Sequence, residues 1–284
     1  MRVLVTGAAG QLGVDVVRHC IDAGDDVVAL DRADLDITDR DAVATAVTAA
    51  RPDAVVNTAA YTAVDACETN IDVAHLVNAT AVGHLAEACS VSGAHLVHVS
   101  TDYVFDGTLD RPYREDDEPN PQSVYGRSKL AGERLAGADA SIARTSWVCG
   151  EHGDNMVKLV LRLAADPDRR LAFVDDQRGC PTFTADLAPA LRRLALDRRS
   201  GVHHLTNAGA VSWYEFVRDV LAAAGHDPAR VRPIATADLD PPRPAPRPAN
   251  SVLDNAAWRA AGLPPLRDFH HPLAELVARL TRHP

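Results

Sequence analysis

The chain has 284 residues, and its 29 basic and 39 acidic residues give a formal net charge of −10, which opposes nonspecific binding to nucleic acid or to an anionic membrane. Five cysteines without a C-x-x-C pair indicate neither a disulfide framework nor a zinc site, so we expect reduced thiols and no metal. No stretch reaches the roughly 18 apolar residues of a membrane span, and we therefore expect a cytoplasmic protein.

The first half of the chain alternates short apolar runs with amphipathic, alanine-rich segments. The predicted strands span residues 2–6, 26–31, 54–58, 95–101 and 141–147, and the predicted helices span 11–23, 39–50, 71–92 and 123–136, with Thr38 as the N-cap of the second helix. Short apolar strands that alternate with helices are typical of a parallel sheet covered on both faces. We therefore predict an α/β fold with a Rossmann-type doubly wound parallel sheet over residues 1–148.

The second half, residues 149–284, is predicted to form mainly a smaller substrate-binding domain. Turn-rich stretches interrupt its helices, and the proline-rich segment 241–248 suits neither a helix nor a central strand. A predicted strand over 202–206 precedes Ser212 and Glu215, which have the spacing of a capping box for a helix through about Ala224. We expect some of these segments to return to the main sheet.

A glycine turn follows the first predicted strand. Gly7, Gly10 and Gly13 permit a tight turn and close backbone approach to a pyrophosphate, at the N-terminus of the helix that follows. The second strand ends at Asp31, whose carboxylate can bind the adenine ribose, while the adjacent Arg32 can pair with a 2′-phosphate. A glycine-rich turn without a ligand is the alternative. The combination predicts a dinucleotide site and leaves the choice between NADH and NADPH open.

Tyr125 and Lys129 lie four residues apart on a predicted helix, so their side chains share one face. A phenol exchanges protons poorly near neutral pH unless a cation stabilises its phenolate, and the ammonium of Lys129 supplies that cation. With five tyrosines and two lysines in 284 residues, the number of Tyr-x-x-x-Lys pairs expected by chance in the whole chain is only roughly 0.035. We predict that the two residues form a proton-transfer pair.

The strand over 95–101 ends in Ser100, Thr101 and Asp102. Ligands of open parallel sheets gather at the carboxyl ends of the strands, so the hydroxyl of Thr101 can hydrogen-bond a reacting carbonyl. A simple turn is the alternative, because serine and threonine favour turns.

Several segments together resemble the dTDP-4-dehydrorhamnose reductases, a family of extended short-chain dehydrogenases/reductases. They are residues 5–13, 57–65, 77–79, 100–107, 124–133, 144–148 and 176–182, in family order and over nearly the whole chain. The related nucleotide-sugar 4,6-dehydratases have Thr-Asp-Glu where this chain has Thr101, Asp102 and Tyr103. The missing acid argues against dehydration.

The resemblance implies a role for many individual residues. Around the dinucleotide it places Gly10, Gln11, Leu12, Asp31, Asp36, Ile37, Ala60, Tyr61 and Thr62, with Tyr125 and Lys129 shared between cofactor and chemistry. Toward the sugar nucleotide it places Thr101, Asp102 and Trp147. For Trp147 the alternative is a place in the core.

The motifs and the resemblance together imply reduction of the C4 ketone of a dTDP-4-dehydro-6-deoxy-L-hexose, such as dTDP-4-dehydro-L-rhamnose, by NADPH or NADH. One alternative is a reductase for another dTDP-4-keto sugar, for example of the dihydrostreptose type. The other is a catalytically silent regulatory subunit that binds the dinucleotide, against which the intact Thr101, Tyr125 and Lys129 argue.

The diphosphate of such a substrate needs cations. Arg243 and Arg247 are candidates, because the proline-rich backbone that carries them has little entropy to lose on binding. A solvated linker is the alternative. A homodimer is one candidate assembly, and we expect neither a nucleic-acid nor a membrane partner.

Overall fold

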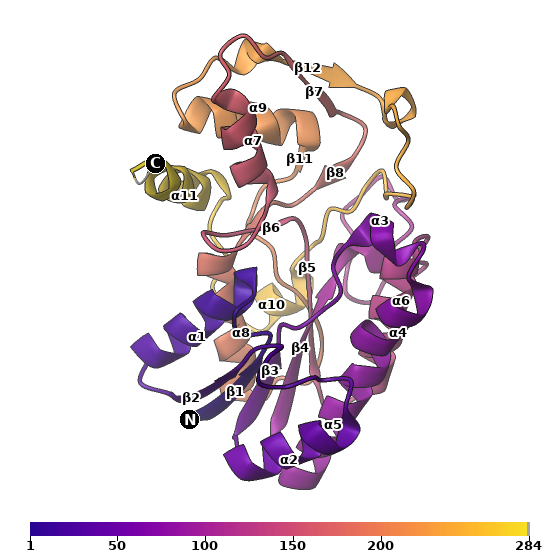
Figure 1. The fold of residues 1–284 in the computed structure, drawn as a ribbon, viewed down its shortest axis with the longest axis vertical. Coiled ribbons are helices and arrows are strands. Elements are labelled where there is room, and N and C mark those ends of the chain that lie inside the picture. The colour runs from indigo at the N-terminus through magenta and orange to yellow at the C-terminus, as the bar shows by residue number, and fades with distance from the viewer. Residues whose placement is uncertain (283–284) are drawn as a thin grey trace.

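The computed structural model describes residues 1–282 and contains a central six-stranded sheet with strand order β10-β5-β4-β3-β1-β2. All of its strand pairs are parallel. Its strands are β1 (Arg2–Thr6), β2 (Asp26–Leu30), β3 (Ala54–Asn57), β4 (His95–Thr101), β5 (Ser141–Thr145) and β10 (Gly201–His204). The predicted α/β fold with a Rossmann-type parallel sheet is confirmed (Figure 1).

Helices cover both faces of this sheet because successive side chains of each strand point to opposite sides. Val3 and Val5 of β1 pack with α1 (Gln11–Asp22) and α8 (Thr184–Asp197). Leu4, between them in the sequence, packs on the other face with α2 (Arg40–Ala50) and α5 (Ala81–Ser92). On that same face, α6 (Val124–Ala136) contacts α5 and β4. α10 (Ala256–Ala260) lies against β10, and its Trp258 packs on the face of α1 and α8.

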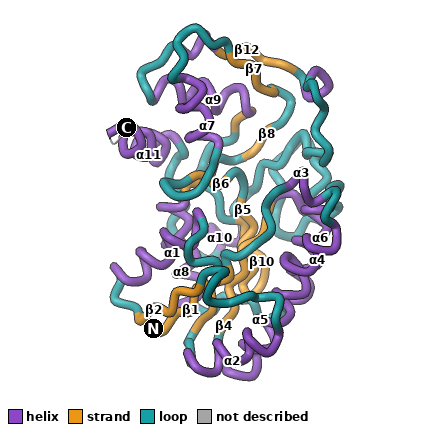
Figure 2. The backbone as a smooth tube through the Cα atoms, viewed as in Figure 1, coloured by secondary structure: helices purple, strands orange, loops and turns teal. Residues whose placement is uncertain are grey.

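A smaller lobe lies beyond the carboxyl ends of the strands (Figure 1). Its three helices enclose an apolar core around Phe216, Phe269 and Leu276. The helices are α7 (Met156–Ala164), α9 (Trp213–Ala223) and α11 (His270–Arg282). The lobe also contains three two-stranded pairs, which are β7 (Leu171–Val174) with β12 (Val231–Ile234), β8 (Arg178–Gly179) with β11 (Val211–Ser212), and β6 (Val148–Cys149) with β9 (Thr182–Phe183). Loops connect this lobe to the sheet (Figure 2).

Short helical segments flank the carboxyl ends of β3 and β4. They are α3 (Val64–Cys67), α4 (Ile71–His75), the π-helical turn η1 (Leu76–Thr80) and the 3₁₀ turn η2 (Asp102–Val104), while η3 (Pro228–Arg230) and η4 (Thr236–Asp238) lie on either side of β12. The predicted helix over 71–92 therefore contains a π turn. Within residues 1–282, no helix has the length and apolarity that a membrane crossing requires.

Two local predictions differ from the structure. Thr38 is not the N-cap of α2: the carboxylate of Asp39 accepts the N–H groups of Asp41 and Ala42, because an aspartate one residue later caps equally well. The strand predicted over 141–147 ends at Thr145, since Trp147 takes a left-handed conformation with φ of 46°. The predicted capping box of Ser212 and Glu215 is confirmed at the start of α9.

The second half of the chain contributes strands and helices to both lobes. β10 pairs with β5 at the edge of the main sheet, and α8 packs on the sheet beside α1. Chain segments on both sides of residue 148 therefore form the large lobe.

Candidate active site

The glycine turn after β1 has the backbone geometry that a bound pyrophosphate requires. Gly7 has a φ of +69°, and a Cβ atom at this position would lie 2.7 Å from the backbone nitrogen of Ala59. A Cβ atom on Gly13 would collide with the carbonyl oxygen of Gly7. Gly10 begins α1 without a side-chain cap, so the first N–H groups of the helix remain available for an anion. These residues fit a dinucleotide.

The other residues expected around the dinucleotide follow the carboxyl ends of β1, β2 and β3. These ends adjoin because Thr6 is in register with Leu30 on one side and with Asn57 on the other. Asp31 accepts the N–H of Ala33 at 2.7 Å. Arg32 and Asp36 are exposed, Leu12 and Ile37 are buried, and Ala60, Tyr61 and Thr62 line the loop after β3.

Contacts also connect the glycine turn to the smaller lobe. The side-chain amide of Gln11 donates to the carbonyl of Val148 at 2.9 Å, and Asn155 donates to the carbonyl oxygen of the Gln11 side chain at 2.9 Å. The predicted dinucleotide site thus lies where the two lobes meet.

Tyr125 and Lys129 lie on the buried face of α6. Ser123 caps the helix by accepting the N–H of Gly126 at 3.0 Å. Gly126 permits close packing on η2, because a Cβ atom there would collide with the carbonyl oxygen of Tyr103. The side chain of Tyr125 meets Tyr103 edge to face, with ring centroids 5.6 Å apart. The predicted pair is therefore buried next to the end of β4.

Burial shifts both members of the pair toward their neutral forms. It raises the pKa of Tyr125 well above the usual range of a phenol, and the hydroxyl of Thr101 opposes this shift. It lowers the pKa of Lys129 to about 8, opposed by Glu133 one turn along the helix. The ammonium of Lys129 donates to the carbonyl of Val99 at 2.7 Å. Lys129 can therefore gain or lose a proton near neutral pH.

Thr101 and Asp102 form a buried hydroxyl and carboxylate cluster at the end of β4. Thr101 donates to one carboxylate oxygen of Asp102 at 2.9 Å, and Ser146 donates to the other at 2.8 Å. Burial raises the pKa of Asp102, while Ser251, Ser146 and Thr101 lower it through hydrogen bonds. Asp102 therefore orients the hydroxyl of Thr101 beside Tyr125.

The two candidate arginines differ in their surroundings. The guanidinium of Arg247 is largely buried and binds the carboxylate of Asp65, with Nη2 at 2.9 Å, which connects the proline-rich segment to α3. Arg243 lies 3.6 Å from the same carboxylate, and its side chain is 60% exposed. Arg243 thus remains open to a ligand, whereas Arg247 is engaged by the protein.

Trp147 lies in the smaller lobe, where its indole packs against Trp213 and Gly179. Its indole stacks on that of Trp213 with ring centroids 3.5 Å apart and an interplanar angle of 8°. Gly179 lies close to its ring, since a Cβ atom there would approach the indole nitrogen to 2.7 Å. Both indoles are half-buried, so they can offer an aromatic wall to a ligand. Sequence reasoning missed Trp213, which no local pattern connects to Trp147.

Residues 77–79 belong to the resemblance, but sequence reasoning assigned no role to Asn78, which lies in the π turn η1. Its side-chain oxygen accepts the N–H of Tyr61 at 2.8 Å, and its amide nitrogen donates to Ser128 at 3.0 Å. Asn78 therefore connects the loop after β3, which is expected to bind the dinucleotide, to the helix that carries Tyr125. π turns in α-helices often mark functional sites, but this one is visible only in the structure, and the signal in the sequence was the resemblance of residues 77–79.

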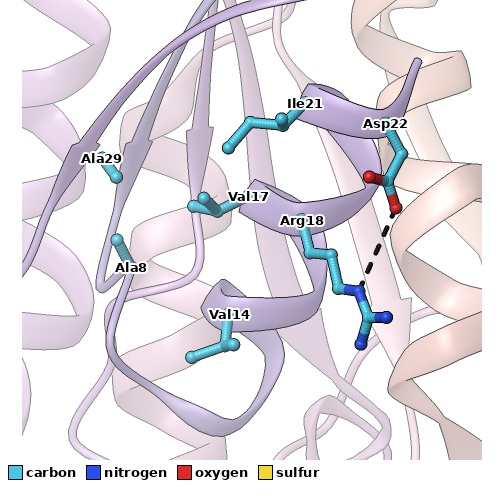
Figure 3. Close-up of a pocket in the computed structure, with 7 residues that line it drawn as sticks. All are labelled: Ala8, Val14, Val17, Arg18, Ile21, Asp22 and Ala29. Carbon is cyan, nitrogen blue, oxygen red and sulfur yellow. Dashed lines mark ion pairs between the residues drawn. The ribbon is translucent and has the colours of Figure 1, made fainter. Parts of the chain in front are cut away.

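Figure 3 shows an open groove of about 410 Å³ between α1 and β2. Its lining is mostly apolar, with Val14, Val17 and Ile21 on the helix, and Arg18 and Asp22 form an ion pair of 4.0 Å at its rim. None of the residues expected to act in catalysis lines it.

Within residues 1–282, no cluster of three or more His, Cys, Asp or Glu side chains is arranged to bind a metal ion.

Comparison with known proteins identifies the family. The family model described as the RmlD substrate binding domain matches residues 1–282. The chain belongs to this family. A dTDP-4-dehydrorhamnose reductase of Streptomyces griseus is 47% identical over 283 residues, which cover 96% of this chain and 92% of the relative. The predicted family is thus confirmed.

Two further relatives bear on substrate and cofactor. A Streptomyces antibioticus protein named probable dTDP-4,6-dihydroxy-2-methyloxan-3-one 4-ketoreductase is 45% identical over 282 residues, covering 97% of this chain and 94% of the relative. The crystal structure of the dTDP-4-dehydrorhamnose reductase of Bacillus anthracis in complex with NADP matches with a TM-score of 0.91 and 34% identity, covering 100% of this chain and 99% of that one.

Proposed function

We propose that the protein reduces the C4 ketone of dTDP-4-dehydro-L-rhamnose to give dTDP-L-rhamnose, with NADPH or NADH supplying the hydride. The observation that carries this proposal is the buried pair of Tyr125 and Lys129 beside the hydroxyl of Thr101, at the carboxyl end of β4. The names of the relatives support a dTDP-sugar as substrate. A protein that only bound the dinucleotide would not need the proton-transfer pair.

In this mechanism the protein positions the ketone and moves a proton. Rotation of the Thr101 hydroxyl lets it donate to the C4 oxygen instead of to Asp102. Tyr125 donates its phenolic proton to the same oxygen as negative charge develops there. Lys129 stabilises the resulting phenolate, one helical turn away.

The cofactor and the nucleotide of the substrate would occupy opposite sides of the reacting carbon. Gly7, Gly10 and Gly13 would hold the pyrophosphate of the cofactor, and Asp31 and Arg32 the adenosine ribose with or without its 2′-phosphate. NADP in a family structure supports NADPH. Residues 149–284 would mainly bind the dTDP-sugar, with Trp147 against the ligand and Arg243 near its diphosphate.

A second candidate substrate is another dTDP-4-keto sugar, which the name of the Streptomyces antibioticus relative favours. The half-buried wall of Trp147 and Trp213 is the part of the site whose shape would select between sugars. The silent regulatory subunit remains the other alternative. We place the enzyme in the cytoplasm, with a homodimer as the assembly to be checked by sedimentation.

The test is a substrate panel on the purified protein. Oxidation of NADPH and of NADH is followed with dTDP-4-dehydro-L-rhamnose and with dTDP-4-dehydro-6-deoxy-D-glucose, in parallel with dinucleotide binding. We expect the highest kcat/KM with the L-rhamnose precursor. A higher value with the other sugar would favour the sibling reductase, and dinucleotide binding without turnover on either sugar would favour the silent subunit.

A further inference from the structure

A chain of buried polar side chains lies beneath Lys129 and crosses three neighbouring strands. Thr6 of β1 donates to the side-chain oxygen of Asn57 on β3 at 2.7 Å. The amide nitrogen of Asn57 lies 3.0 Å from Nδ1 of His98 on β4, and Nε2 of His98 lies 3.4 Å from Nζ of Lys129. Asn57 and His98 are fully buried. No step of the mechanism above uses this chain of groups.

The hydrogen bonds determine which nitrogen of His98 carries the proton. The backbone N–H of Ala59 can only donate, and it lies 3.1 Å from the side-chain oxygen of Asn57, which fixes that oxygen as the acceptor. The amide nitrogen of Asn57 must then donate to Nδ1 of His98, so this nitrogen has no proton. Burial lowers the pKa of His98 well below its usual value, which leaves the ring neutral. The single ring proton therefore resides on Nε2.

This tautomer directs an N–H group at Lys129. The carbonyl of Val99 already accepts one hydrogen of the Lys129 ammonium at 2.7 Å. The Nε2–H of His98 cannot form a hydrogen bond with this ammonium, because both groups are donors. A neutral amine, by contrast, has a lone pair that accepts this N–H. We propose that His98 is a positioning residue whose Nε2–H, fixed by Asn57, favours the neutral amine of Lys129 and so helps it pass a proton to Tyr125.

Few other groups act on Lys129 from the surrounding elements. Titratable groups on the elements packed against α6 are His95 and His98 on β4, Asp102 and Tyr103 on η2, Asp65 and Cys67 on α3, Asp72 and His75 on α4, and His84, Glu87 and Cys89 on α5. On α6 itself Glu133 opposes the loss of the lysine proton, and Arg144 from β5 binds Glu133. Of the described residues, only Val99 and His98 lie within hydrogen-bond distance of Nζ.

This inference rests on the proposed reduction and completes its proton balance. When the O–H bond of Tyr125 breaks and an O–H bond forms on the C4 oxygen, a buried phenolate remains. Tyr125 lies beyond hydrogen-bond distance of Nζ, so a hydroxyl between the two groups, such as one of the cofactor ribose, would pass its proton to the phenolate and take one from Lys129, whose N–H bond breaks as the phenol is restored. His98 then donates its hydrogen bond to the neutral amine and keeps its own proton. A proton from solvent restores the ammonium, so one turnover consumes one proton.

The experiment measures the pKa of Lys129 directly. Because the chain has only two lysines, protein labelled with ¹³C at lysine Cε gives two NMR signals, and a Lys158→Arg variant assigns them. In His98→Asn, the side-chain oxygen can still accept from Asn57, but no N–H reaches Lys129. In His98→Gln, the longer side chain can restore an N–H near the position of Nε2.

We expect His98→Asn to raise the pKa of Lys129 by about 0.5 to 1 pH unit, and His98→Gln to leave it near the wild-type value. The alkaline limb of kcat should move by the same amount. An unchanged pKa in His98→Asn, or an equal shift in both variants, would contradict the proposal. Because the titration needs no substrate, it remains decisive even if the proposed reaction is wrong.

A second measurement covers the case in which His98→Asn does not fold. In wild-type protein labelled with ¹⁵N at histidine, the chemical shifts of the ring nitrogens report the tautomer. We expect His98 to be neutral and protonated at Nε2. Protonation at Nδ1 would overturn the proposal.

Discussion

The interiors of the two lobes differ in the chemistry of their buried side chains. Beneath α6 the large lobe buries His98, Asp102, Lys129, Glu133 and Arg144. Each is hydrogen-bonded to another polar side chain or to a backbone carbonyl. The core of the smaller lobe consists of apolar side chains, mainly from α7, α9 and α11, and the stacked indoles of Trp147 and Trp213 pack against it. We propose that the large lobe carries out the proton chemistry and that the smaller lobe recognises the shape of the substrate. Substitutions that change charge should act in the first, and those that change shape in the second.

The largest effect on stability should come from the buried ion pair in the large lobe. Arg144 donates to Glu133 through Nη2 at 2.7 Å, and both side chains are almost completely buried. We expect Arg144→Met to lower the free energy of unfolding by about 3 to 5 kcal/mol, because it leaves a buried carboxylate unpaired. Urea titration measures the change. Adding Glu133→Gln should recover most of the loss, and a cost below about 1 kcal/mol for the single variant would contradict this account.

The next effect is a dependence of stability on pH. Burial lowers the pKa of His204 at the end of β10 to about 3, so the folded protein keeps this ring neutral while the unfolded chain takes up a proton below about 6.5. The unfolded state then binds more protons, and stability falls as the pH falls through this window. We expect a loss of about 1.4 kcal/mol per pH unit from His204, or roughly 2 kcal/mol at pH 5.

Urea titrations at about pH 7 and about pH 5 measure this slope. The His204→Gln variant should have a smaller slope, and the remaining slope should reflect His98, His95 and His19, whose pKa values burial also lowers. Equal slopes in the variant and the wild type would show that His204 is not a neutral buried group.

In the smaller lobe, Leu276→Ala should lower stability equally at both pH values, because it removes only apolar contacts.

The third effect concerns the aromatic wall of the smaller lobe. We expect Trp213→Ala to raise the KM for the dTDP-sugar about tenfold with little change in kcat, because Trp147 loses the ring that orients it. Two indoles stacked at 3.5 Å produce an exciton couplet in the circular dichroism spectrum, which should disappear in the variant. Trp258→Phe is the matched control, since that indole donates to the carbonyl of Pro264 elsewhere. A couplet that survives Trp213→Ala would contradict the stacking.

The smallest effect should come from Arg243. Its exposed guanidinium is screened by solvent, so we expect Arg243→Ala to raise KM by less than about fivefold, and less still at high salt. Arg243→Lys should retain part of the affinity. No change in KM at low salt would show that this arginine does not approach the diphosphate.

Local spacing explains why much of the fold and of the site could be predicted. The interval between Tyr125 and Lys129 is one helical turn, and the glycine turn is a feature of consecutive residues. The pairs that were missed lie far apart in the chain: His98 with Asn57, Trp147 with Trp213, and Arg247 with Asp65. Such contacts depend on how the strands and lobes assemble, which no local pattern encodes. Thr38 failed as a cap because its neighbour Asp39 competes for the same N–H groups.

The measurement that tests the central claim most directly follows the product of one reaction in two proteins. Wild type and Tyr125→Phe are given dTDP-4-dehydro-L-rhamnose and NADPH deuterated at the transferred position, and NMR follows the sugar. We expect deuterium at C4 of dTDP-L-rhamnose with wild type, and a rate about 10² to 10⁴ times lower with the variant, which still binds the dinucleotide. A wild-type rate in Tyr125→Phe, or no reduced sugar from wild type, would contradict the account.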